Sequence, residues 1–282
     1  MKNTIRLLGI IALIALQSTI VVAQGGNEGA GQGGSQGGGS QSTGQGASQN
    51  TNQNAPMVNQ AVGTPGPEYA SINNDTAYAV RVGTANGDIV IPATHNGKPI
   101  MTIPSGAFRN RTDITSVTIS NNVTRIEQTA FSGCTNLARV FIPNSVTLIA
   151  DQAFEGSGLT SVNIPDSVTS LGNAVFRNCA KLANVTIGNN VPSIGTSVFY
   201  NCSSIVTITL PESVTAIGTN AFNGCDSLVD VTIEGTITSG RFASVSPFPG
   251  DLRTRYFIRD ARAGGPGNYT RPDGSSRSWI KT

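Results

Sequence analysis

Phenylalanine recurs along the middle of the chain at an almost constant spacing. The intervals are 23, 23, 22, 23 and 23 residues, between Phe108, Phe131, Phe154, Phe176, Phe199 and Phe222. An aliphatic residue follows each phenylalanine six positions later, or five positions later in the 22-residue unit, where it is Leu159. The phase recovers after that one-residue loss, which is typical of a repeating structural unit with tolerant loops.

Each of these aliphatic residues opens the spacing L-x-x-V-x-I, as in Leu137, Val140 and Ile142. The last two aliphatic positions alternate with polar ones, which is the period of a short strand with one buried face. A second aliphatic pair follows with the spacing V-x-x-I, and the phenylalanine turn closes the unit. Proline follows the strand in three units, where the backbone no longer needs a ladder donor. These are Pro143, Pro165 and Pro211.

One unit of about 23 residues is too small to bury its own apolar face, but stacked units bury a continuous interior. Stacking places each strand about 4.8 Å from its neighbour. The pattern therefore predicts a solenoid with one parallel sheet, an aliphatic interior and a spine of phenylalanines. An earlier unit is expected through 89–91, which makes about seven coils.

The full unit, L-x-x-V-x-I-P-x-S-V-T-x-I-G-x-x-A-F-x-x-C, resembles the leucine-rich repeat of the BspA type found in bacterial and some protozoan surface proteins. Segments 137–154 and 205–225 match it nearly residue for residue, and 89–100 is similar to the family's first coil. The resemblance covers about residues 68–240. It implies an α/β repeat solenoid with one parallel β-sheet, short irregular, 3-10 or helical turns on the opposite side, and a C-terminal β cap. The family is implicated in adhesion, including the binding of host matrix proteins and other microbes, although such repeats are scaffolds for many functions.

The N-terminus has the pattern of a signal peptide. Lys2 and Arg6 precede an apolar run from Leu7 to Val22, and small residues precede a cleavage point after Ala23. A run of this length is short for a bilayer core of about 30 Å. We therefore expect residues 1–23 to be removed and no stable membrane span to remain, with an uncleaved anchor as the alternative.

Residues 24–67 contain 13 Gly and 8 Gln among 44 residues and almost no large apolar side chain. Such a composition predicts a disordered linker, because it offers too little apolar surface to offset the entropy of ordering. The expected organisation is a linker over 24–67, the solenoid over 68–240, and a C-terminal cap with a basic β-hairpin segment over 241–282.

Charge is sparse, at 12% of residues, and the formal net charge is +2. Residues 104–240 hold six basic and nine acidic side chains, and 241–282 hold eight basic and three acidic ones. Neither segment is charged enough to bind nucleic acid along its length. The single histidine, His95, lies in a predicted turn, and no pair of acids recurs at a spacing suited to acid–base catalysis. We expect no enzymatic activity, no metal site and no cofactor.

The cysteines all lie three residues after a repeat phenylalanine: Cys134, Cys179, Cys202 and Cys225. In a secreted chain, four cysteines would normally suggest two disulfides. Equivalent positions in adjacent coils, however, have Cβ vectors that run parallel and do not converge. We favour a ladder of small buried thiols, with disulfides as the alternative.

The outward positions of the predicted strands carry mostly hydroxyl and amide side chains. The exception is the strand that places Phe141 beside Arg139, a combination enriched at binding hot spots. The candidate binding surface is Arg139, Phe141, Asn163, Asn184, Thr186 and Thr209. The alternative is that stacked threonines merely favour the strand conformation.

Residues 268–280 contain two β-rich arms around Pro272-Asp273-Gly274, which predicts a hairpin. The segment resembles a short C-terminal sequence, Y-T-R-P-x-G-x-x-x-x-W, seen after such repeats in spirochaete proteins. We interpret it as a terminal cap, because the end of a solenoid exposes its core. The alternative is a surface-attachment tag that uses Tyr269, Arg271, Arg277 and Trp279.

Together these patterns predict an exported cell-surface or secreted protein. It would act as a protein–protein interaction or adhesion module through the exposed face of its parallel sheet. The expected partner is macromolecular, either a host matrix protein or another cell surface. The alternative is a structural envelope protein without a specific ligand.

Overall fold

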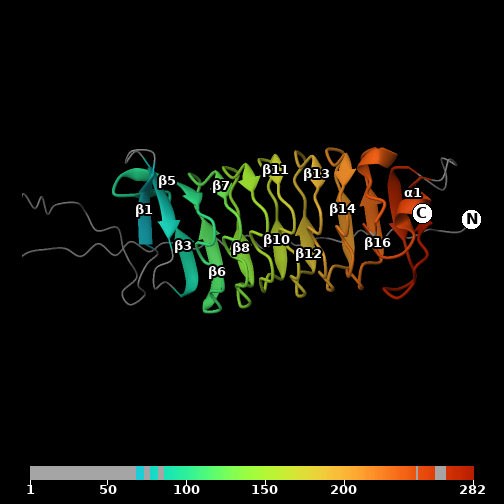
Figure 1. Ribbon diagram of the computed structural model, residues 1–282, viewed down its shortest axis with the longest axis horizontal. Helices are drawn as coiled ribbons and strands as arrows, with labels where there is room; N and C mark the ends of the chain where they lie inside the picture. The colour runs from blue at the N-terminus through green and yellow to red at the C-terminus, as the bar shows by residue number, and fades with distance from the viewer. Residues whose placement is uncertain (1–67, 73–76, 82–85, 246, 258–264) are drawn as a thin grey trace, which may run out of the picture. The chain divides into compact units, whose positions relative to one another are not determined.

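The computed structural model describes residues 68–72, 77–81, 86–245, 247–257 and 265–282. The predicted signal peptide (1–23) and linker (24–67) lie outside the described residues. From residue 86 onward the chain winds into successive coils that stack along one axis (Figure 1).

The L-x-x-V-x-I segments form short parallel strands, as predicted. Strand β3 pairs with β6 and β6 with β8, while β10 pairs with β12 and β14 with β16. These strands follow one another along the stack (Figure 1). The bounds of this main ladder are β3 (Gly87–Ile91), β6 (Ile114–Ile119), β8 (Arg139–Phe141), β10 (Ser161–Asn163), β12 (Asn184–Thr186), β14 (Thr207–Leu210) and β16 (Asp230–Ile233).

The prediction of one parallel sheet was wrong, because the V-x-x-I pairs form a second parallel ladder. Strand β5 pairs with β7, β7 with β9 and β9 with β11, and β13 pairs with β15. In each two-residue strand only the second residue, such as Ile126, is a buried aliphatic one, and the backbone bonds to the coils on either side. The bounds are β5 (Lys98–Ile103), β7 (Arg125–Ile126), β9 (Leu148–Ile149), β11 (Ser170–Leu171), β13 (Ser193–Ile194) and β15 (Ala216–Ile217).

Two short hairpins precede the first phenylalanine turn. Strands β1 (Glu68–Ile72) and β2 (Ala77–Arg81) pair antiparallel, and β2 continues the second ladder by pairing parallel to β5. Strand β4 (Thr94–His95) turns back onto β5 through Asn96 and Gly97, which both have positive φ. The second ladder therefore begins at β2, before the first repeat phenylalanine, Phe108.

The phenylalanine turns are irregular and not helical. Each turn contains two residues with φ between about 54° and 78°, four positions apart, such as Thr129 and Gly133. Their peptide N–H groups donate to the next coil, for example from Phe108 to the carbonyl oxygen of Ala130 at 2.7 Å. Left-handed residues interrupt any helix, so the predicted 3-10 or helical turns are not formed. Among the described residues the only helices follow the coils: a 3-10 turn at Ser239–Arg241 and α1 (Leu252–Tyr256).

The interior is an aliphatic core with a continuous stack of rings. Neighbouring phenylalanine rings, from Phe108 to Phe222, are nearly parallel, with centroids 5.1, 5.2, 5.6, 5.5 and 5.2 Å apart. Phe248 adds one more ring, 4.6 Å from Phe222. All six repeat phenylalanines are fully buried. The sequence period thus corresponds to one rise of the stack.

The chain reverses after the last coil. Strand β17 (Gly267–Thr270) pairs antiparallel with β16, and β18 (Ile280–Lys281) pairs antiparallel with β17. The predicted β-rich arms therefore exist as strands, and they extend the main ladder.

Candidate functional site

The candidate surface is the outward side of the main ladder, which we call the exposed sheet face. All six predicted binding residues lie on it and all are exposed: Arg139, Phe141, Asn163, Asn184, Thr186 and Thr209. The alternation of the strands explains this, since residues two apart share one side of a sheet. Asn163 lies directly opposite Thr186 in the ladder, so these two side chains are neighbours.

Phe141 has the largest apolar group on this face, with 58% of its side chain exposed. Its register partner is Thr118, and the partner of Thr118 on the other side is Val90, which is 61% exposed. Val90 is not among the six binding residues predicted from the sequence. The alternation Ile89-Val90-Ile91 could have identified it, because both isoleucines are buried and the residue between them must point outward.

A second row of the same face carries the charged groups. Asp88, Ser116 and Arg139 are register partners on three successive strands. The Asp88 carboxylate accepts hydrogen bonds from Ser116 at 2.6 Å and from Thr115 at 2.8 Å. These bonds hold the pKa of Asp88 below its usual value. The Arg139 guanidinium, two strands away, makes no hydrogen bond to another described residue and lowers the pKa of Asp88 further by its charge.

The centre of the face is uncharged and its polar groups are unused. Seven exposed side chains on β6, β10, β12 and β14 make no hydrogen bond to another described residue. They are Thr118, Ser161, Asn163, Asn184, Thr186, Thr207 and Thr209. Their hydroxyls and amides can both donate and accept.

The main ladder is interrupted between β8 and β10, and again between β12 and β14. A shallow open hollow of about 280 Å³ lies at the second interruption, lined in part by Thr186, Asn189, Thr209 and Glu234. Two of the six predicted binding residues, Thr186 and Thr209, therefore border a depression in the exposed sheet face.

The four residues considered for a surface-attachment tag differ in accessibility. Tyr269 and Trp279 are fully buried, Arg271 is 5% exposed, and only Arg277 is exposed. The indole N–H of Trp279 donates to the carbonyl oxygen of Pro249 at 2.7 Å. The hydroxyl of Tyr269 donates to the carbonyl oxygen of Gly265, and burial raises its pKa to about 12.

Arg271 joins the C-terminal segment to the last coil. Its guanidinium donates to the carbonyl oxygens of Leu228, of Cys225 at 3.4 Å, of Asp226 at 3.2 Å and of Ser276 at 2.7 Å. It also lies over the ring of Trp279, with 5.1 Å from the guanidinium carbon to the ring centroid. Burial lowers the pKa of Arg271 from its usual value. All of these contacts are made within the protein.

An open hollow of about 950 Å³ lies between the last coil and this C-terminal segment. Charged residues of both signs line it: Arg271, Arg277, Asp226 and Asp251. Asp251 is already engaged, because it accepts from the backbone N–H of Trp279 at 2.9 Å and from Arg255 at 3.1 Å. The mixed charge favours no single class of ligand.

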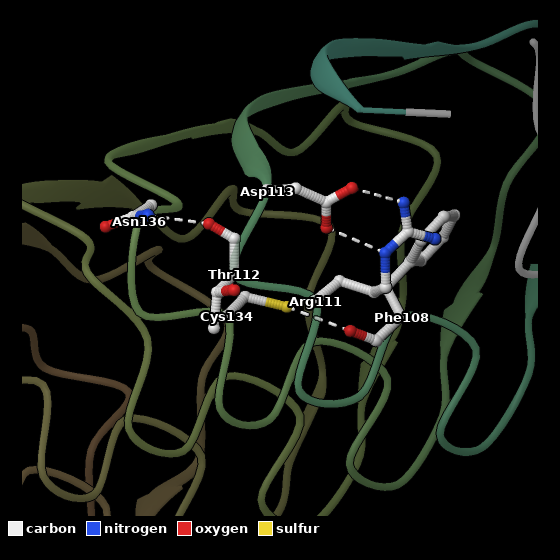
Figure 2. A network of polar contacts seen from close by, with 6 residues as sticks. All are labelled: Phe108, Arg111, Thr112, Asp113, Cys134 and Asn136. Atoms are coloured by element: carbon white, nitrogen blue, oxygen red, sulfur yellow. Dashed lines mark hydrogen bonds and ion pairs between the residues drawn. The ribbon is translucent and has the colours of Figure 1, made fainter. Parts of the chain in front are cut away.

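The four cysteines are buried thiols and are not bonded to one another. Each Sγ donates to the carbonyl oxygen of a phenylalanine in the preceding coil, as Cys134 does to Phe108 at 3.0 Å (Figure 2). Burial raises the pKa of Cys134 to about 11 and that of Cys225 to about 12. The thiols thus satisfy buried carbonyl oxygens, and their burial disfavours the thiolate form.

Figure 2 also shows why one coil tolerates arginine at the cysteine position. Arg111 turns outward and forms an ion pair with Asp113 at 2.7 Å, while Asn136 donates to the carbonyl oxygen of Thr112 at 2.6 Å. In the described part of the chain, no group of three or more His, Cys, Asp or Glu side chains could hold a metal ion. Nor does any helix within those residues have the length and apolar character to span a membrane.

Comparison with known proteins places this arrangement in a family. Six copies of a model described as "BspA type Leucine rich repeat region" match residues 101–241, which is half of the chain. The chain belongs to the BspA-type leucine-rich repeat family. No curated protein matches it.

Solved structures of bacterial proteins resemble the chain to different extents. The T. pallidum leucine-rich repeat protein TpLRR is 28% identical with a TM-score of 0.56, over 58% of this chain and 78% of that one. A Bacteroides ovatus leucine-rich repeat protein is 20% identical with a TM-score of 0.47, over 63% and 53% of the two chains. The pneumococcal vaccine antigen PcpA is 20% identical with a TM-score of 0.45, over 65% and 50%. The match thus spans about half the length of the last two proteins.

Proposed function

We propose that this protein is an exported interaction and adhesion module that binds a macromolecular partner through the exposed sheet face. Leucine-rich repeat proteins are generally protein-interaction modules, and this chain belongs to such a family. The observation that carries the proposal is the group formed by Val90, Arg139 and Phe141. Val90 and Phe141, both exposed, lie on either side of Thr118 in one row of outward positions. The Arg139 guanidinium lies in the neighbouring row, on the same strand as Phe141.

The residue types in this group suit a binding site more than a structural role. Scattered apolar residues are normal on a surface, but an aromatic ring beside an arginine is the combination enriched at binding hot spots. Nothing in the coil's own packing requires Phe141 to be aromatic, because its ring is mostly in solvent. A binding role explains the ring, whereas a purely structural role would be served by threonine, as in Thr118.

The experiment is affinity capture with the full chain as bait against host matrix proteins and bacterial cell surfaces. The double variant Phe141→Ser/Arg139→Ser should lose the captured partner. The matched control is Val245→Ser, since Val245 is similarly exposed (56%) but belongs to none of the strands of the main ladder. Absence of any saturable binding would instead favour the structural envelope role.

Export is part of this proposal and rests on residues 1–23, with 24–67 as a linker that holds the solenoid away from its point of attachment. The mature protein should begin at Gln24. N-terminal sequencing of the protein recovered outside the cell tests this directly. A mature chain that begins at Met1 or Lys2 would contradict cleavage.

For the C-terminal segment we propose the cap role over the tag role. In support, Tyr269 and Trp279 are fully buried, and the Arg271 guanidinium donates to carbonyl oxygens of the last coil. A tag needs accessible side chains, and of the four only Arg277 is exposed. Arg277→Ala should therefore leave surface retention unchanged, whereas a tag would lose it.

A further inference from the structure

The exposed sheet face is uncharged over three consecutive strands. The outward positions of β10, β12 and β14 are Ser161, Asn163, Asn184, Thr186, Thr207 and Thr209. The nearest outward charges on the same ladder are Arg139 on one side and Asp230 on the other. Charge complementarity therefore disfavours a polyanion or a polycation along these strands and favours a neutral partner.

The hydrogen-bonding groups of this region are all available. None of the six side chains bonds to another described residue, and each can donate and accept. Sugar hydroxyl groups have the same dual capacity. Serine and threonine, in contrast, are under-represented among the hot spots of protein interfaces. The region thus suits a hydroxyl-rich ligand better than it suits the apolar centre of a protein interface.

The groups repeat at a fixed interval along the stack. The phenylalanine rings report a coil spacing of 5.1 to 5.6 Å between centroids. A linear polysaccharide in an extended conformation presents its sugar rings at a comparable spacing. Such a polymer lying along the stack axis would meet one amide or hydroxyl per sugar over several coils.

One end of the region has an aromatic platform. The Phe141 ring is 58% exposed and lies in the same row as Asn163, Thr186 and Thr209. Aromatic rings present a flat apolar face, which complements the C–H face of a pyranose. Arg139 lies on the same strand and supplies donors beside the ring. Farther along, the hollow of about 280 Å³ between Thr186 and Thr209, which Glu234 also lines, leaves room for a protruding neutral sugar substituent.

From these observations we propose that the exposed sheet face binds a linear neutral polysaccharide that lies along the stack, with one sugar ring against Phe141. This inference rests on the proposed function and specifies its partner as a glycan of another cell surface. The row of contacts is Phe141, Asn163, Thr186 and Thr209.

The test is titration calorimetry of the full chain with cellohexaose, mannohexaose and xylohexaose, and with the shorter members of any series that binds. Affinity should rise with each added sugar until the oligosaccharide spans the row, and then level off. Thr186→Val and Thr209→Val should each weaken binding about fivefold, the equivalent of one hydrogen bond. Phe141→Ala should weaken binding about tenfold or more.

Threonine-to-valine changes keep the branched shape and the strand preference, so the fold is retained. The matched control is Thr169→Val, because Thr169 is exposed but precedes β11 in the second ladder. This variant should bind as the original chain does. Equal weakening by Thr169→Val would mean that the effect is not on the exposed sheet face, and the inference would be wrong.

The outcomes separate this inference from the proposed function. Failure of all three hexasaccharides to bind would overturn the inference. Capture of a protein partner in a Phe141-dependent manner, without glycan binding, would also overturn it while leaving the proposed function in place. Glycan binding that is unaffected by the threonine and phenylalanine variants would contradict the assignment to this face.

Discussion

Arg271 is the side chain whose removal should most clearly reveal how the C-terminal segment is held. It is 5% exposed and donates to four carbonyl oxygens, three of them on the last coil and one within the C-terminal segment. It also lies over the Trp279 ring. Arg271→Ala removes all of these contacts at once and leaves buried carbonyl groups without donors.

The magnitude follows from the number of contacts. The two long bonds from Nη2, to Cys225 at 3.4 Å and Asp226 at 3.2 Å, are counted together as one shared bond. With the bonds to Leu228 and Ser276 this gives three contributions of about 1 kcal/mol each, and a cation–π contact of about 1 kcal/mol brings the sum to roughly 4 kcal/mol. Burial of the guanidinium costs free energy, as its lowered pKa indicates, and water can re-enter the space. We therefore expect Arg271→Ala to lower the free energy of unfolding by about 3 kcal/mol.

Urea denaturation of the full chain, followed by Trp279 fluorescence, measures this change. Trp279 is the single tryptophan, so its signal reports on the segment itself. Arg271→Lys should recover little, because an ammonium group lacks the planar fork that reaches several carbonyls. The control is Arg277→Ala, an exposed arginine of the same segment, which should change stability by less than about 0.5 kcal/mol.

The reasoning would be refuted if Arg271→Ala and Arg277→Ala destabilised the protein equally, or if Arg271→Ala cost less than about 1 kcal/mol. Either result would mean that the segment is not held by these bonds. The cap role proposed for it would then lose its main support.

Three further predictions concern the coils. Phe154→Ala should lower the free energy of unfolding by about 3 to 5 kcal/mol in urea denaturation, since its ring is fully buried with neighbouring ring centroids at 5.2 and 5.6 Å. Phe141→Ala should lower it by less than about 0.5 kcal/mol, and similar losses for the two variants would contradict the ring stack. Gly188→Ala should destabilise the protein by about 1 to 3 kcal/mol, because a Cβ there would lie 2.4 Å from a backbone oxygen of the preceding coil, while Gly240→Ala, with nothing within 4 Å, serves as the control that should be neutral. The four buried thiols should resist a thiol reagent until urea unfolds the chain. Burial raises the pKa of Cys134 and Cys179 from 9.0 to about 11 and that of Cys225 to about 12, so the free energy of unfolding should fall as the pH rises from 9.0 toward 12. A flat profile over that range would indicate that the thiols are exposed in solution.

Much of the fold could be predicted because the same pattern of residues recurs in every coil. The alternation Val140, Phe141, Ile142 defines one buried face of a strand, and the phenylalanine period defines the rise of the stack. The outward positions of the candidate surface followed from the same alternation. Where the pattern repeats with a fixed phase, local sequence and tertiary packing lead to the same structure.

The second ladder was not predicted, for a physical reason. A pair of aliphatic residues three positions apart, such as Val146 and Ile149, does not show the alternation of a strand. The strand that contains Ile149, β9, has only two residues and is unstable without neighbouring strands. It forms because the coils above and below supply its hydrogen bonds. The turns were misjudged for a related reason, since the left-handed conformation of Thr129 or Gln152 is held by bonds to the next coil and not by residue preference.

The sequence alone thus determined the repeat, the direction of each main strand and the side on which Arg139 and Phe141 lie, because these depend on spacing within one unit. Tertiary structure decided that Val90 joins Phe141 across Thr118 and that Tyr269, Arg271 and Trp279 are buried against the last coil. These features depend on which segments become neighbours after stacking. Contacts between distant units are formed by the packing of whole coils, and no local pattern of residues encodes them.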